Sequence, residues 1–86
     1  MRMDTESFES YVVSSLVIEA FSEYLEELQT DLIKIDGLEI HEVEDNKIVV
    51  SYECESLEQS RTRMEELSRD ERIIGLNLVY LNFEEA

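Results

Sequence analysis

The order of two periodicities along the chain limits its possible folds more than any other feature. Four apolar runs rich in β-branched residues indicate strands, and they lie at about 12–20, 38–43, 47–52 and 73–81. Two intervening stretches repeat apolar residues at helical spacing, which predicts helices at about 23–34 and from Ser56 onward. Ser22 is expected to cap the first helix, and Ser56 with Gln59 forms a capping box for the second.

This β-α-β-β-α-β order predicts an α+β, ferredoxin-like fold. Right-handed crossovers through both helices give a four-stranded antiparallel sheet in the order 4-1-3-2, with both helices on one face. The 86 residues contain no proline, so a single domain over 1–86 is expected, with an ordered core at about 11–83. Alternation along the strands directs ten residues toward the helices: Leu16, Ile18, Leu38, Ile40, Ile48, Val50, Tyr52, Leu76, Leu78 and Tyr80.

The charge balance excludes whole classes of partner. Asp and Glu number 22 against 7 Lys and Arg, and the net charge of −15 repels nucleic acids and anionic membrane surfaces. A basic peptide would be attracted. No apolar run is long enough to insert into a membrane or to act as an export signal, and a single cysteine suits a reducing compartment. A cytoplasmic location is therefore predicted.

Alternation also predicts that the sheet face away from the helices is half apolar. Such a face usually presents polar side chains to water, so exposed valines on its central strands indicate a binding surface. An apolar peptide could lie on the valines while carboxylates at the rim pair with its arginines. The pattern does not distinguish a peptide from a second copy of the chain, so a monomer and a weak dimer both stay open. Leu81 is placed on this face, and the candidate binding residues are Val13, Ser15, Val17, Glu19, Glu39, Val49, Ser51, Glu53, Asn77 and Val79.

Residues suited to catalysis or metal binding are scarce. His41 is the only histidine and is expected to be an exposed strand side chain, while Cys54 is expected to be a packed, unreactive thiol. The phosphate-binding and dinucleotide-binding glycine motifs are missing, as is a C-x-x-C pair. We therefore predict no catalytic residues, no metal site and no cofactor, and the protein is not expected to be an enzyme.

Four segments, at 14–20, 36–40, 47–50 and 78–80, carry a resemblance to a known family by their order and spacing. On these segments, the chain from Val13 onward resembles the NapD family. Arg72 stands where that family often has glycine, and Leu81 where it often has histidine. The resemblance implies a chaperone that binds the twin-arginine signal peptide of the catalytic subunit of a periplasmic nitrate reductase on its open sheet face. Export is thereby delayed until the molybdenum cofactor is inserted, and the chaperone itself carries no cofactor.

Two other classes of protein share the predicted strand order. An ACT-like regulatory or dimerisation module usually has glycine in the turn after the first strand, where this chain has Ala20-Phe21-Ser22-Glu23. A hydrolase of the acylphosphatase kind needs an anion-binding loop with an arginine near the first strand, and the same turn has neither glycine nor a basic residue. Both classes are thus less favoured than the chaperone.

Overall fold

The predicted element order is confirmed by the structure, a computed structural model that describes the backbone of residues 10–85 and the side chains of residues 12–80. A short 3-10 helix, Ser22–Tyr24, leads into the first α-helix. In chain order the main elements are β1 Ser10–Ala20, α1 Leu25–Leu32, β2 Leu38–Glu44, β3 Lys47–Cys54, α2 Leu57–Ser68 and β4 Ile73–Glu85.

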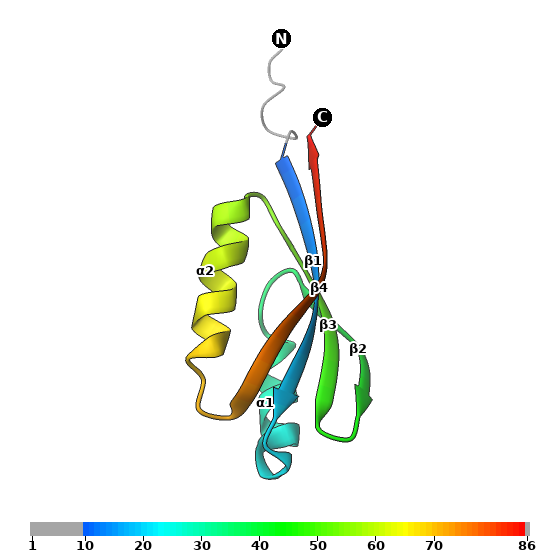
Figure 1. The fold of residues 1–86 in the computed structure, drawn as a ribbon, viewed down its shortest axis with the longest axis vertical. Coiled ribbons are helices and arrows are strands. Elements are labelled where there is room, and N and C mark those ends of the chain that lie inside the picture. The colour runs from blue at the N-terminus through cyan, green and yellow to red at the C-terminus, as the bar shows by residue number, and fades with distance from the viewer. Residues whose placement is uncertain (1–9, 86) are drawn as a thin grey trace.

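The four strands form one antiparallel sheet in the order β2-β3-β1-β4, as predicted. Figure 1 shows both helices on the same side of this sheet, with the other side uncovered. The arrangement follows from the two crossovers, since each helix connects two strands that follow each other along the chain but are not neighbours in the sheet. We call the uncovered side the open face.

The core lies between the two central strands and the helices. Leu16 and Ile18 of β1 and Ile48 and Val50 of β3 are at most 1% exposed. They pack with Leu28 and Leu32 of α1 and Leu67 of α2, and Leu38 and Tyr52 are buried beside them. Ile40 and Leu76 are half-buried at the margin. Eight of the ten predicted core residues therefore contact or form the core.

Of the other two, Leu78 faces the helices as predicted, opposite Leu16 and beside residues of α2, and only Tyr80 was placed on the wrong face. Both are exposed, Leu78 by 46% and Tyr80 by 54%. Leu16 pairs with Leu78 while Ser15 pairs with Tyr80, so β4 holds one extra residue, Val79, at this point. Such a β-bulge shifts the alternation of the strand by one residue. Tyr80 consequently lies opposite Ser15 on the open face.

Leu81, which the sequence analysis placed on the open face, follows the bulge, and its backbone pairs with Ser14. The side chain of Leu81 lies outside the described residues.

The two helix starts differ in how well the sequence predicted them. Ser56 Oγ accepts a hydrogen bond from the Gln59 amide at 3.1 Å, which confirms the cap of α2. The Gln59 side chain accepts in return from the Glu55 amide at 2.9 Å. The predicted Ser22 cap is wrong, because Phe21 precedes the 3-10 helix there and no side chain caps it.

Arg72 holds the loop before β4 against the first helix. Its guanidinium donates to both carboxylate oxygens of Asp70, at 2.9 and 2.8 Å, and to Asp31 and Glu27 of α1 at 2.8 and 3.2 Å. The resulting hydrogen bonds hold the pKa of the Asp70 carboxyl below its usual value. Arg72 is thus a structural link between the loop that follows α2 and the helix of the first crossover.

Candidate peptide-binding face

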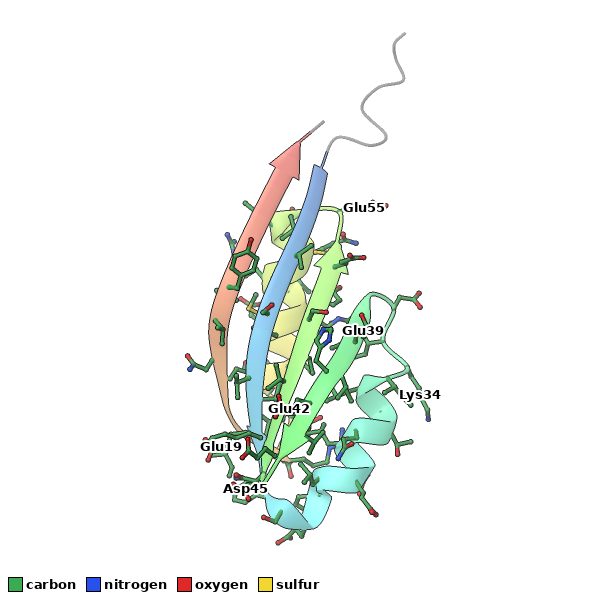
Figure 2. The ribbon with its side chains drawn as sticks, turned by 90° about the vertical axis from the view of Figure 1, so that its right-hand side faces the viewer. Glu19, Lys34, Glu39, Glu42, Asp45 and Glu55 are labelled. Atoms are coloured by element: carbon green, nitrogen blue, oxygen red, sulfur yellow. The ribbon has the colours of Figure 1, made fainter. Side chains whose placement is uncertain are left out.

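The open face is a surface whose residues line up in rows across the four strands. Figure 2 views it with the helices behind, and labels Glu39, Glu42 and, at the lower end, Glu19 and Asp45. The pairing registers and the bulges place on it all ten predicted binding residues, and add Glu42, Glu44, Lys47 and Tyr80. The prediction that these residues share one surface therefore agrees with the strand registers, while their binding role stays a prediction.

The centre of the open face is apolar. Val17 lies opposite Val49 on one side and Asn77 on the other, and both valines are half-buried. Val79 is 62% exposed, and with Tyr80 it forms the β4 side of the face. Apolar side chains left exposed beside one another on a sheet are typical of a binding surface.

A polar row crosses this apolar centre. Ser15 pairs with Ser51 on the neighbouring strand, and Ser51 Oγ is 2.8 Å from Nε2 of His41. His41 is exposed, as predicted, but its ring is tied to β3 by this contact. Hydroxyl groups at the centre of the face can hydrogen-bond a peptide backbone laid across it.

The β2 side of the open face is acidic. Glu39 lies opposite Ser51, Glu42 opposite Val49 and Glu44 opposite Lys47. A bulge at His41 produces this arrangement, because the register shifts between Ile40 and Glu42. Simple alternation would have placed Val43 there instead of Glu42 and Glu44. The sequence analysis missed these two carboxylates because the bulge depends on the neighbouring strand.

A hollow joins the acidic margin to the apolar centre. Its volume is about 320 Å³, and we call it the Glu42 hollow. Valine side chains from the two central strands and charged groups from the β2–β3 hairpin surround it. The lining residues are Val17, Glu42, Glu44, Asp45, Lys47 and Val49.

Chemical groups for catalysis are sparse in the described part of the chain. No group of three or more His, Cys, Asp or Glu residues within it could hold a metal ion. The Cys54 thiol is half-buried and donates to the Ser56 carbonyl at 3.2 Å. None of the described helices is long and apolar enough to cross a membrane.

The turn after β1 does not provide an anion site. The nearest hollow, of about 460 Å³, is lined by Phe21, Glu23, Tyr24, Glu27, Glu71 and Arg72. The guanidinium of Arg72 is already hydrogen-bonded to three carboxylates, and three glutamates surround the hollow. An incoming phosphate would meet negative charge there, which argues against the hydrolase alternative.

Comparison with known proteins gives one consistent relationship. The family model described as NapD protein matches residues 11–85. The solution structure of the E. coli Tat proofreading chaperone protein NapD is similar, with a TM-score of 0.75 and 28% sequence identity. The match covers 81% of this chain and 76% of that one. No curated protein sequence matches the chain. Since the family model spans most of its length, the chain belongs to the NapD family.

Proposed function

We propose that the protein is a proofreading chaperone of twin-arginine export that binds a twin-arginine signal peptide on its open face. The proposed partner is the catalytic subunit of a periplasmic nitrate reductase, held in the cytoplasm until its cofactor has been inserted. The chaperone carries no cofactor and catalyses no reaction. Membership of the NapD family carries this proposal, and the relative from E. coli is described as a Tat proofreading chaperone.

The chemistry of the open face supports a partner that is both basic and apolar. Such a peptide could bury its apolar stretch on Val17, Val49 and Val79 while its arginines meet carboxylates at the margin. The proposed binding residues are those expected from the sequence, together with Tyr80 and Glu42.

The direct test is a calorimetric titration of the purified protein with a synthetic twin-arginine signal peptide from a nitrate reductase catalytic subunit. A second peptide with both arginines replaced by glutamine is the control. Tight binding that is lost with the glutamine peptide is the expected result. If neither peptide binds, the chaperone function proposed here is wrong.

Two substitutions test the position of the site. Val17→Glu and Ser15→Arg both place a charge in the middle of the open face, where it would have to be desolvated under the peptide. We expect each to weaken binding by at least about tenfold. Thr62→Glu and Thr62→Arg are the matched controls, since Thr62 is exposed on α2, on the opposite side of the sheet.

Circular dichroism and thermal unfolding would establish that all four variants remain folded. Unchanged peptide affinity in a folded Val17→Glu protein would place the peptide elsewhere. Gel filtration over a range of concentrations addresses the alternative function, because a stable dimer that persists on dilution would favour a dimerisation module.

A further inference from the structure

The open face changes in character from one edge of the sheet to the other. On the β4 side, no charged residue occurs between Ile73 and Tyr80, and Val79 and Tyr80 are more than half exposed. On the β2 side, every open-face residue placed by direct pairing is a glutamate: Glu39, Glu42 and Glu44. A ligand with one cationic and one apolar end therefore has a preferred direction across the strands.

The Glu42 hollow lies where these two regions meet. Val17 and Val49 supply apolar surface, while Glu42, Glu44 and Asp45 supply carboxylates. An arginine side chain has the matching structure, with an apolar stem of three methylene groups and a guanidinium that hydrogen-bonds carboxylates in pairs. Lys47 is the one cation of the lining, so its single positive charge faces three carboxylates.

We infer that the Glu42 hollow receives a guanidinium group of the signal peptide, and that the apolar stretch of the same peptide runs from there toward β4. This inference rests on the proposed function and adds the direction in which the peptide is bound. From β2 to β4 the sheet spans three strand spacings, or about 14 Å. About nine residues of helix or about four of extended chain cover that distance, which suits an apolar stretch that follows the arginines closely.

A triple variant that removes the charge of the three carboxylates tests the hollow. Glu42→Gln, Glu44→Gln and Asp45→Asn together keep the size of the side chains, and asparagine tolerates the positive φ of 56° at position 45. The matched control neutralises Glu26, Glu58 and Glu65, three exposed carboxylates on the helices, so both variants carry the same net charge.

We expect the hollow variant to bind the twin-arginine peptide at least about tenfold more weakly, and the helix control to change affinity less than about threefold. The glutamine peptide should not distinguish the two variants. If both triple variants weaken binding equally, only the overall charge matters and the hollow is not the site. That result would leave the proposed function intact, whereas failure of the unmodified protein to bind would remove it.

Lys47→Gln gives a prediction in the opposite direction. Removing the ammonium leaves three carboxylates without a competing cation, so affinity for the twin-arginine peptide should rise about threefold. Lys34→Gln makes the same change of charge in the α1–β2 turn, away from the open face, and should have a smaller effect (Figure 2). An equal gain in peptide affinity in both variants would contradict binding of a guanidinium group in the hollow.

The direction of the peptide is tested by paramagnetic broadening in NMR spectra of the 15N-labelled protein. A nitroxide attached at the apolar end of the synthetic peptide should broaden the amide resonances of Val79 and Tyr80 more than those of Glu42 and Glu44. A nitroxide beside the arginines should give the reverse pattern. The same broadening from both labels, or the opposite assignment, would overturn the proposed direction.

Discussion

Gly37 determines how the chain enters β2. Its φ is +86°, and a Cβ atom added there would collide with the carbonyl oxygen of Glu53. The Gly37 carbonyl also accepts a hydrogen bond from the Glu53 amide at 2.9 Å, so the two backbones cannot separate without losing it. Any L-side chain at this position therefore meets both a steric clash and an unfavourable backbone conformation.

Gly37→Ala should lower the free energy of unfolding by about 2 kcal/mol or more. Urea denaturation followed by circular dichroism measures the change. Gly75→Ala is the control, because no atom lies within 4 Å of a Cβ added at Gly75. We expect the control to shift stability by less than about 0.5 kcal/mol. Equal losses in the two variants would show that the close approach to Glu53 is not what requires glycine.

At the scale of elements, a buried hydrogen bond between two serines connects α2 to β1. Ser14 Oγ and Ser60 Oγ are 3.0 Å apart, and the two residues are 0% and 2% exposed. Removing one hydroxyl leaves the other buried without this partner, whereas removing both leaves only apolar groups in contact.

Ser14→Ala alone should therefore cost about 1–2 kcal/mol of stability, and the double variant with Ser60→Ala should cost less than the sum of the single changes. Ser68→Ala, at the exposed end of α2, is the control for loss of a helix hydroxyl. Strictly additive effects in this double-mutant cycle would contradict a direct hydrogen bond between the two serines.

Arg72 and Asp70 join the loop before β4 to α1, and this link predicts a dependence of stability on pH. The pKa of Asp70 is lowered in the folded state by its hydrogen bonds to Arg72. The unfolded chain then binds a proton more readily, so the stabilisation is complete above the unfolded pKa and is lost as the pH falls through the folded one.

Asp70→Asn should reduce the free energy of unfolding by about 1 kcal/mol at about pH 6, and the difference from the unmodified protein should shrink toward pH 2.5. Urea unfolding at a series of pH values tests this. Glu65→Gln, which neutralises an exposed carboxylate of α2, is the control and should show no such convergence. A difference that stays constant with pH would show that Asp70 acts by something other than its charge.

For the molecule as a whole, the net charge of −15 predicts how binding responds to salt. Long-range attraction speeds the encounter with a cationic peptide, while the buried apolar contacts mainly set the rate of release. Raising the salt concentration from about 50 mM to about 500 mM should slow association by about tenfold and change dissociation much less. Stopped-flow fluorescence with a labelled peptide measures both rates. Association that is independent of salt would contradict electrostatic steering.

Much of this protein follows from local sequence. The two periodicities define the order of the elements, and the handedness of crossovers then leaves one sheet order and one uncovered face. The valines at 13, 17 and 49 lie on that face because β1 and β3 pair without a shift in register. The capping box of α2 also follows from residues three positions apart.

The tertiary structure decided where the two edge strands, β2 and β4, shift register against the central strands. The extra residue at Val79 moves Tyr80 to the open face, and the bulge at His41 brings Glu42 and Glu44 there. A bulge forms where one strand must accommodate one residue more than its neighbour, so its position depends on pairing between distant segments. Local alternation contains no information about that pairing. The sequence therefore determined the face of the sheet, and only the packed sheet determined the acidic hollow on it.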